Sequence, residues 1–461
     1  MNREAYFNGH SKEFSNHGEQ EQQIAAGYFS EDLKLLKKGV WLFFILLILE
    51  GALRKWVLPG LATPLLIVRD PLAVWMIYKA IQKGIWRPGP YVLVMWMVTV
   101  LSLAVTFILG HGNLLVAFYG FRITVLLFPV IFIIGTVFNR DDVIRVGKAM
   151  LWITLVMTVL VAFQFYSPQS AWVNRGVGGD ISGSGFSGAA GFLRVPGTFS
   201  FTNGLSLFYG LAAAFIFYFW IEEKNKGVSK ILLVLASFSL FAAIPLSISR
   251  TVVFEILLSL IFMIAVSWKN PKVFKSILGF IFIGVLLFIM LGNFSFFETA
   301  SIALTERFTT ANSIEGGMVE GVFLERFLGG MFSAITNETF AFWGGGLGMG
   351  TSVGAEVLAG GRGVYLIAED EWARIVGEMG LIFGLSVILL RVILAFDLLK
   401  KAWKNLTWTN VLPWMLMSFG LLNILQGQWS QPTNLGFVVL VAGLSLASLR
   451  KSNSSDENCN Y

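Results

Sequence analysis

The chain alternates long apolar stretches with short polar connections. Each apolar stretch runs for about twenty residues, the length of a helix that crosses a bilayer, and none shows the two-residue alternation of a barrel strand. Inside hydrocarbon, only helices and closed barrels satisfy every backbone polar group. The pattern therefore predicts an all-α, polytopic membrane protein with about 12 transmembrane helices. The expected spans are 39–58, 61–81, 90–110, 114–137, 146–166, 198–221, 230–248, 250–268, 273–293, 373–396, 410–428 and 433–449.

The longest interruption of this pattern lies between Phe294 and Arg374. It is rich in Gly, Arg and Glu, and its centre reads Trp343-Gly344-Gly345-Gly346-Leu347-Gly348-Met349-Gly350. We expect a long outer loop between the ninth and tenth helices, with a glycine turn in which the backbone packs closely. The resulting division is an N-terminal tail over 1–38, helices one to nine over 39–293, the loop over 294–372, helices ten to twelve over 373–449 and a C-terminal tail over 450–461.

The composition supports a membrane protein and excludes several other classes. Hydrophobic residues make up 56% of the chain and charged residues 13%, far from the balance of a soluble domain. The formal net charge is +6, but the basic residues fall in short runs between apolar segments, so we expect no nucleic-acid partner. One cysteine, Cys459, and three histidines, His10, His17 and His111, are too few and too scattered for a metal site, and we expect no cofactor.

Basic residues indicate how the chain is oriented. If the N-terminus is cytoplasmic, every even-numbered span returns to the cytoplasm, and every inner connection then carries Lys or Arg, as the positive-inside rule requires. The first residues do not have the pattern of a signal peptide, so we expect both termini to be cytoplasmic. The inner basic residues are Lys83, Arg87, Arg140, Arg145, Lys148, Lys224, Lys226, Lys230, Lys269, Lys272, Lys275, Lys400, Lys401, Lys404, Arg450 and Lys451.

The outer connections carry arginine rather than lysine. Among the lysines, only Lys55 falls on the outer side. Arginine suits planar, bidentate recognition of phosphate or carboxylate, so these residues are candidates for binding an anionic group. The alternative is that several of them pair with glutamates of the same loops. The outer arginines are Arg54, Arg175, Arg194, Arg250, Arg307, Arg326, Arg362 and Arg374, and the glutamates are Glu298, Glu306, Glu315, Glu320 and Glu325.

Several charged residues fall inside the predicted spans. Glu50, Arg122 and Glu255 lie in the first, fourth and eighth spans, and Arg69-Asp70-Pro71 interrupts the second. Such residues are costly in a membrane and usually face a partner or a water-filled cavity. Two interpretations of the tripeptide are open. Arg69 and Asp70 neutralise each other at a proline kink, or they line a polar pathway together with Glu50, Arg122 and Glu255.

Three outer stretches hold candidate chemistry. The first runs from the glycine-rich segment 176–191, which we interpret as a flexible connection, to Arg194, beside an expected helix start whose free N–H groups favour an anion. The second is 247–251, a tight turn whose arginine either snorkels to the interface or lines a polar cavity. The third ends at Arg374 and Glu378, which share a helix face and can form an ion pair.

Four short patterns occur in order along residues 190–390. They are Arg194-x-x-Gly197-x-Phe199-x-x-x-Asn203, Ser247-x-Ser249-Arg250, Gly345-x-Leu347-Gly348-x-Gly350 and Glu371-Trp372-x-x-Ile375-x-Gly377-Glu378-x-Gly380. Together with the layout of spans around one long outer loop, this order resembles the O-antigen ligase/polymerase superfamily. The resemblance implies a metal-independent glycan transferase of the bacterial inner membrane. Such an enzyme moves a glycan from an undecaprenyl-pyrophosphate carrier to an acceptor on the periplasmic face.

The resemblance also implies roles for individual residues. Arg194 and Arg250 would grip the pyrophosphate, and a carboxylate would accept the proton of the attacking hydroxyl. The candidates for that carboxylate are Asp370 and Glu371. The ligase branch places a histidine in the late loop, where this chain reads Ala368-Glu369-Asp370-Glu371, and this departure favours a polysaccharide polymerase over an O-antigen-type ligase. Residues expected to contribute to substrate binding are Arg122, Asn203, Arg326, Arg374 and Glu378.

Two readings from other classes remain open. A membrane transporter or flippase of lipid-linked sugars would use Glu50, Asp70, Arg122 and Glu255 as a midplane pathway, although the chain lacks the internal repeat on which many transporters are built. A non-catalytic partner of other polysaccharide-assembly proteins would need no individual outer Arg or Glu. The predicted function is a polymerase that extends a surface polysaccharide, with membrane lipid and the carrier-linked oligosaccharide as its partners.

Overall fold

The computed structural model is built mainly of helices. It describes residues 30–189, 191–222, 227–269, 274, 277–279, 284, 295–315, 342–360, 367–368, 370–407 and 410–450. A first helix covers 30–52 and so begins before the predicted boundary at residue 39. The elements that follow are η1 (Leu53–Val57), η2 (Pro59–Leu61), η3 (Pro64–Ile67), α2 (Asp70–Gln82), α3 (Pro90–Ile108), α4 (Leu114–Phe121), η4 (Arg122–Leu127), α5 (Phe128–Val137), α6 (Arg140–Tyr166), η5 (Trp172–Asn174), β1 (Phe186–Ala189), β2 (Phe192–Arg194), α7 (Thr202–Ile221), α8 (Lys230–Ser247), α9 (Arg250–Lys269), α11 (Ser295–Glu315), α13 (Ser352–Ala359), α14 (Glu371–Lys404), α15 (Leu412–Gln426) and α16 (Pro432–Ser448).

The helices confirm the membrane class that the apolar pattern predicts. Within the described ranges, seven helices are long and apolar enough to cross a membrane: α3, the continuous helix from α4 through η4 to α5, α6, α7, α8, α9 and α14. The protein is therefore a membrane-embedded helical protein. The number of about 12 spans stays a prediction, because the segment 273–293 lies mostly outside the described residues.

The segment expected as the second span, 61–81, is not one continuous helix. Two short 3₁₀ turns, η2 and η3, come first, and each begins at a proline, which fits the first turn of a helix but interrupts a helix that precedes it. Regular α-helix begins only with α2, which has 13 residues. At about 20 Å it is too short to cross a hydrocarbon core of about 30 Å. The segment is therefore not among the seven helices long enough to cross a membrane, and the full span over 61–81 stays a prediction.

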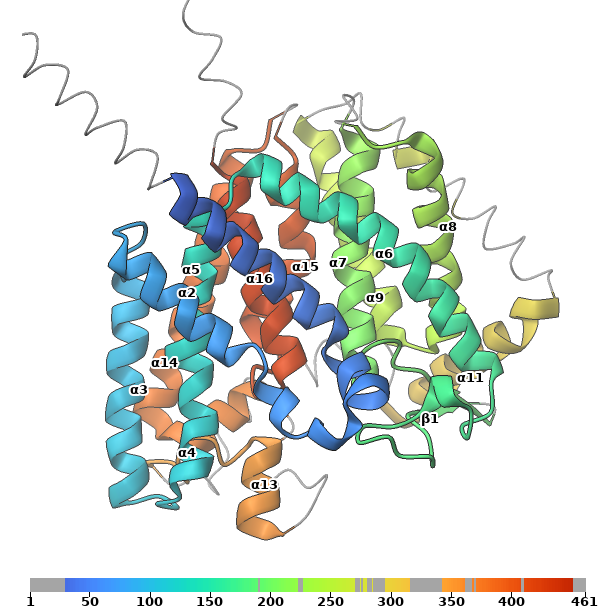
Figure 1. The fold of residues 1–461 in the computed structure, drawn as a ribbon. Coiled ribbons are helices and arrows are strands. Elements are labelled where there is room, and N and C mark those ends of the chain that lie inside the picture. The colour runs from blue at the N-terminus through green and yellow to red at the C-terminus, as the bar shows by residue number, and fades with distance from the viewer. Residues whose placement is uncertain are drawn as a thin grey trace, which may run out of the picture.

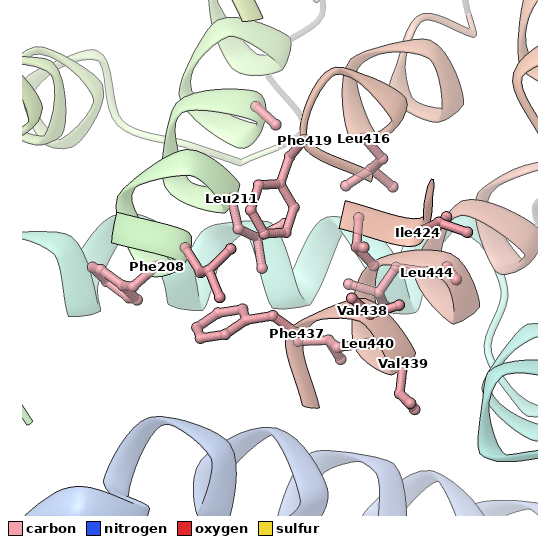
Figure 2. Close-up of a cluster of buried hydrophobic side chains, with 14 of the residues drawn as sticks. Phe208, Leu211, Leu416, Phe419, Ile424, Phe437, Val438, Val439, Leu440 and Leu444 are labelled. Carbon is pink, nitrogen blue, oxygen red and sulfur yellow. The ribbon is translucent and has the colours of Figure 1, made fainter. Parts of the chain in front are cut away.

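The centre of the molecule is formed by α7, α15 and α16. Figure 1 shows α15 and α16 in the middle, with α5 and α14 on one side and α7 and α9 on the other. In Figure 2, Phe208 and Leu211 of α7 face Phe419 of α15 and Phe437 of α16, whose rings lie 6.2 Å apart. Of the most apolar stretch of α7, 94% is buried in protein. These helices are apolar all round because other helices surround them on every side.

The connections predicted for the inner side meet one another at one end of the bundle, which we call the basic end. Lys37 Nζ lies 2.5 Å from Asp142 Oδ2, and the Arg450 guanidinium donates to the Phe138 carbonyl (3.4 Å). The first and last described residues therefore lie at the same end, as Figure 1 also shows. That arrangement agrees with the prediction that both termini face one side of the membrane.

The connections predicted for the outer side meet at the opposite end, which we call the loop end. It contains 54–69, 110–113, 167–201 and 342–351, which are far apart in sequence but bonded to one another. The described parts of these connections therefore divide between two ends as the charge pattern predicts, and the order of crossings stays a prediction. Joining contacts at the loop end are Gly178 N–H to the Arg54 carbonyl (3.1 Å), His111 N–H to the Gly345 carbonyl (3.1 Å) and Arg54 Nη1 to Ser200 Oγ (2.8 Å).

Helix α14 folds back on itself at Gly380. This residue has φ 77° and ψ 175°, a conformation that is essentially confined to glycine. A Cβ placed on Gly384 would lie 2.8 Å from the Cα of Val376, which on a straight helix would be about 12 Å away along the axis. The segment 371–379 therefore lies against the start of the second part, 381–404. Only the second part is a membrane-crossing helix, and the prediction of one continuous span over 373–396 is wrong.

Candidate functional site

The first group of predicted site residues is built around Arg194. This arginine is the last residue of β2, and its Nε donates to the Ser187 carbonyl across the hairpin (3.0 Å). The register of the hairpin places Arg194 opposite Phe186. Helix α7 begins only at Thr202, eight residues later. The expectation that Arg194 lies beside a helix start is therefore wrong, and the strand orients its side chain instead.

Arg250 and Arg307 lie close enough to Arg194 to act on its charge. Arg250 begins α9, directly after a turn in which Ile248 has φ 47°. Arg307 lies on α11, and its Nη1 donates to the Gly188 carbonyl of the hairpin (3.5 Å). Partial burial lowers the pKa of Arg194, and the positive charges of Arg307 and Arg250 lower it further. These three residues, the arginine cluster, form a cationic site that a bound anion would stabilise.

The loop 194–203 is anchored by the end of the first helix. Lys55 is fully buried, and its Nζ donates to the Gly197 carbonyl (2.7 Å). Arg54 is also buried and donates to Ser200 Oγ (2.8 Å). Arg54 was among the outer arginines considered for anion binding, and Lys55 is the lysine predicted on the outer side. Their contacts instead hold the loop that carries Arg194.

Asn203, predicted to bind substrate, lies one residue into α7 and links this helix to α16. Its Nδ2 donates to Asn434 Oδ1 (3.2 Å). One turn further along α7, Ser206 Oγ bonds Ser249 Oγ (2.9 Å), directly before Arg250. These polar contacts join the arginine cluster to the central helices.

Three other predicted residues form a second group, the α14 network. Arg374 donates from Nε and Nη2 to the two carboxylate oxygens of Glu371 (both 2.9 Å), and its Nη1 lies 2.7 Å from Glu378 Oε2. All three side chains are buried. The ion pair between Arg374 and Glu378 confirms the contact predicted from their spacing. Bidentate, charge-assisted bonds of this kind fix the positions of both partners.

Arg391 completes the α14 network, and sequence reasoning missed it. Its Nη1 donates to Glu371 Oε1 (2.9 Å), and its other nitrogens donate to the carbonyls of Ile424 (2.9 Å) and Gly427 (2.8 Å). The guanidinium carbon lies 4.0 Å from the ring centre of Trp429. Glu371 is thus bonded by two arginines. A charged residue inside an apolar span is a signal that could have identified Arg391.

The glycine-rich segment 342–351 is bonded to the break in α14. The Gly345 N–H donates to the Gly377 carbonyl (2.7 Å), one of the carbonyls that the break leaves without a helical partner. The Glu378 carboxylate in turn accepts from the Gly350 N–H (2.8 Å). A Cβ on Gly350 would lie 2.9 Å from that same carboxylate, which confirms the expected close approach of the backbone. The segment therefore holds the fold-back of α14 in place.

A small cavity lies between the α14 network and η4. Its volume is about 20 Å³, enough for one water molecule. Glu371, Arg374 and Glu378 line it together with Thr124 of η4 and Trp429. The indole Nε1 of Trp429 is buried and has no hydrogen-bond partner among the described residues. A water in this cavity would have charged and polar groups around it.

The charged residues predicted at membrane depth form pairs, but not the expected ones. Arg122, on η4, bonds both oxygens of Asp70, with Nη2 at 2.7 Å from Oδ1. Arg69 instead donates to Glu50 Oε2 (3.1 Å) and to the Pro432 carbonyl (2.5 Å). The interpretation of Arg69 and Asp70 as a self-neutralised pair is wrong, because each finds its partner on another helix. Arg122, expected to bind substrate, is already bonded to a carboxylate.

Glu255 belongs to a different contact. Its Oε1 accepts from Asn423 Nδ2 of α15 (3.2 Å), while Oε2 is buried with no hydrogen-bond partner in the part of the chain that the structure describes. The four residues predicted as one transport pathway are therefore divided between separate contacts.

Asp370 is the predicted catalytic carboxylate that stays exposed. It occupies the position before the first turn of α14, and its side chain caps no backbone N–H. Arg326, which was expected to bind substrate, and Glu369, the neighbour of Asp370, lie outside the described residues. Within the ranges that are described, no three His, Cys, Asp or Glu side chains come together in a group that could hold a metal ion.

Comparisons with known protein families and with characterised proteins gave no match. The class is defined by the chain itself: a helical membrane protein in which Arg250 and Arg307 lie close enough to Arg194 to act on its charge, and in which α14 carries a separate, buried ion-pair network.

Proposed function

We propose that the protein is a polymerase of the glycosyltransferase type. It extends a surface polysaccharide from an undecaprenyl-pyrophosphate-linked donor at the outer face of the bacterial inner membrane. The observation that carries this proposal is the meeting of Arg194, Arg250 and Arg307 from three separate connections. Guanidinium groups bind phosphate oxygens bidentately, and a pyrophosphate offers several such oxygens. The resemblance of the sequence around Arg194 and Arg250 to the O-antigen ligase/polymerase superfamily indicates the substrate.

The proposed reaction is a single displacement. A hydroxyl oxygen of the acceptor sugar attacks the anomeric carbon of the donor glycan on the face opposite the pyrophosphate. The new bond from carbon to oxygen forms as the bond from that carbon to the phosphate oxygen breaks, and the lipid pyrophosphate leaves with the bonding electrons. The arginine cluster stabilises the charge of the leaving group. A carboxylate accepts the hydroxyl proton, and the configuration at the anomeric carbon is inverted.

Asp370 fits the proton-accepting role better than Glu371. The oxygens of Glu371 are bonded by Arg374 and Arg391 in a buried site, so they are not available to a hydroxyl group. Asp370 is exposed, and its side chain makes no capping bond. Its own carbonyl accepts from the backbone N–H of Arg374 (2.9 Å), and this first hydrogen bond of α14 holds the backbone from which the carboxylate projects.

Replacing the arginines tests the pyrophosphate site. Each variant is expressed in a strain from which the gene has been deleted. Membranes of that strain, which contain the accumulated donor, are then assayed for chain extension. We expect Arg194→Ala and Arg250→Ala to lower the rate of chain extension about 10²–10³-fold, the usual loss when a group that stabilises transition-state charge is removed. Arg87→Ala, at an exposed position at the basic end, is the matched control and should extend the polymer normally. Wild-type rates in both cluster variants, at normal protein levels, would show that the pyrophosphate site is wrong.

Asp370→Asn tests the proton acceptor. The amide keeps the shape of the side chain but cannot accept the proton, so we expect chain extension to slow about 10²–10⁴-fold. Donor binding should be unchanged, because the arginine cluster is intact. Asp397→Asn, on the same helix but at the basic end, serves as the control. If Asp370→Asn extends the polymer at the wild-type rate, the base lies elsewhere.

Purified protein in liposomes separates the proposal from its alternatives. Carrier-linked oligosaccharide is supplied on one side, and its length and location are followed. Chain extension supports the polymerase, and transfer to a separate lipid acceptor supports an O-antigen-type ligase. Movement across the bilayer without extension supports a transporter or flippase.

A further inference from the structure

The connection between the first helix and α2 is apolar although it lies at the loop end. From Trp56 to Val68 the chain carries no charged residue. Val57 and Leu61 are 62% and 50% exposed, and Leu58 between them is 42% exposed. On a connection that faced water, these side chains would stay unpaired. Exposed apolar patches of this kind mark a contact with another molecule or with a membrane.

A second connection extends this apolar patch. The rings of Trp56 and Trp172 stack with their centres 5.5 Å apart, and Trp172 is 58% exposed. A Cβ on Gly179 would lie 3.2 Å from Pro59, so the two connections are in contact. Ile181, two residues after Gly179, is 73% exposed. We call Val57, Leu58, Leu61, Trp172 and Ile181 the outer apolar surface.

The backbone of the segment 56–68 suits a place where water is scarce. The N–H groups of Leu58, Leu61 and Ala62 donate to carbonyls three or five residues earlier in the chain (2.7, 3.0 and 3.1 Å). Pro59 and Pro64 have no N–H to satisfy. A backbone polar group that enters a bilayer needs a partner within the protein. The tight turns and the prolines therefore allow this segment to lie against lipid without forming a regular helix.

The outer apolar surface connects two rows of exposed apolar side chains. In each row the residues lie three or four positions apart, which places them on one face of a helix. One row ends at Leu49, eight residues before Val57, and the other begins at Val74 of α2. In a membrane protein such rows face lipid, so lipid is the partner that fits the surface between them. The rows are Leu42, Ile45 and Leu49 on the first helix, and Val74, Tyr78 and Ile81 on α2.

The length of α2 places the segment near the outer boundary of the hydrocarbon. Lys83, directly after α2, pairs with Asp32 at the start of the first helix (2.8 Å), so α2 ends at the basic end. Its 13 residues extend about 20 Å from there. About 10 Å of a core of about 30 Å then remain for the segment that precedes α2. Interfacial segments lie about 5–10 Å deep, and tryptophan is enriched at that level.

Arg54 joins the outer apolar surface to the loop that carries Arg194. Its Nε donates to the Ala62 carbonyl (2.7 Å), and its Nη1 donates to Ser200 Oγ (2.8 Å). One buried guanidinium therefore holds both connections. Figure 1 shows the segment 56–68, in blue, beside the green connection that leads to β1. A change in the depth of the surface would move the loop 194–203 with it.

We propose that the outer apolar surface lies in the outer lipid–water interface and binds lipid there, and that Arg54 thereby holds the loop of Arg194 at the level of the lipid phosphates. The lipid contact follows from the exposure, the continuity and the depth of the surface. Its effect on the arginine cluster rests on the proposed function. A pyrophosphate attached to a lipid lies at this level, so the cluster would meet it without drawing the carrier out of the membrane.

Spin labels test the lipid contact without any assay of activity. In a Cys459→Ser background, a nitroxide is attached to Leu61→Cys in liposomes, and its collisions with oxygen and with a water-soluble nickel chelate are measured. Oxygen concentrates in hydrocarbon, and the chelate stays in water. Ile45→Cys on the first helix is the lipid control, and Ser352→Cys, at an exposed position at the start of α13, is the water control. We expect the ratio of oxygen to nickel collisions at Leu61→Cys to exceed that at Ser352→Cys at least about fivefold.

Three results would overturn the lipid contact. A ratio at Leu61→Cys equal to that at Ser352→Cys would show that the surface faces water. A label shielded from both reagents would show that protein covers the surface. Broadening of the spectrum by a second label nearby would identify that protein as a second copy of the chain.

A charge in the outer apolar surface tests its effect on the arginine cluster. We expect Leu61→Glu to raise the KM for the carrier-linked donor about tenfold, because even a small displacement of a binding group is costly, while kcat changes little. Leu61→Trp, which suits the interface, should keep the wild-type KM. Val357→Glu, at an exposed position on α13, is the control for the charge itself and should have no effect.

The two proposals fail in different ways. If Arg194→Ala stops extension while Leu61→Glu keeps the wild-type KM, the polymerase stands and the effect of the surface on the arginine cluster is wrong. If Arg194→Ala extends normally, the proposed function fails, and the spin labels still decide the lipid contact.

Discussion

Gly348→Ala should remove most of the folded protein from the membrane. Gly348 has φ 85°, and a Cβ on it would overlap the Val116 carbonyl of α4. Left-handed strain costs about 1–3 kcal/mol. Overpacking against backbone costs about 1–3 kcal/mol more. The sum approaches the total stability of many proteins, about 5–15 kcal/mol. The N–H of Gly348 also donates to Glu378 Oε2 (3.2 Å), so a shift would disturb the α14 network. The measurement is the amount of monodisperse protein after extraction in detergent and its midpoint of thermal unfolding.

Gly360→Ala is the matched control for this prediction. Gly360 also has a positive φ, 65°, but no atom lies within 4 Å of a Cβ placed there. Only the strain of the left-handed conformation is added, about 1–3 kcal/mol. We expect this variant to fold and to lose modest thermal stability. Equal losses in the two variants would mean that Gly348 is needed for its backbone conformation alone, and not for the contact with α4.

Arg391→Met should destabilise the protein by about 3–5 kcal/mol, the usual cost of removing one partner from a buried ion pair. The change leaves Glu371 and Glu378 with a single arginine between them and takes the donors away from the carbonyls of Ile424 and Gly427. Methionine keeps much of the volume, so the loss reports charge and hydrogen bonding more than packing. Thermal unfolding in detergent gives the size of the effect.

Two further variants establish the cause. Lys401→Ala removes an ion pair with Asp397 on the same helix, but that lysine side chain is 50% exposed, so we expect a loss of only about 0–1 kcal/mol. Adding Glu371→Gln to Arg391→Met removes one negative and one positive charge together. We expect the double variant to recover part of the loss. A double variant as unstable as the sum of the two single variants would show that charge balance is not the reason.

The apolar pattern predicted the helices better than their interruptions. It predicted the membrane class and the assignment of connections to two ends, because both follow from segment length and the distribution of Lys and Arg. It did not predict the fold-back at Gly380, because a single glycine within an apolar run is compatible with a continuous helix. The fold-back depends on bonds from Gly345 and its neighbours, which come from a different part of the chain.

Only part of the candidate site could be predicted, because contacts between distant parts of the chain cannot be derived from local patterns. Arg374 pairs with Glu378, as helical spacing suggested, and Arg250 lies close enough to Arg194 to lower its pKa, while the roles of these residues stay predictions. The contact of Glu371 with Arg391 could not be foreseen, since 20 residues of straight helix would separate them by about 30 Å. Because that contact occupies the carboxylate of Glu371, our proposal assigns the proton-accepting role to Asp370.

The short α15–α16 hairpin also constrains how the protein is assembled. At 15 and 17 residues the two helices lie at or below the usual minimum for a membrane span, about 17 residues, so we expect them to enter the bilayer as a pair. A turn with two glutamines is costly in lipid, and it becomes stable only when α7 and α14 already surround it. We therefore expect α15 and α16 to insert after α7 and α14, the earlier helices against which they pack.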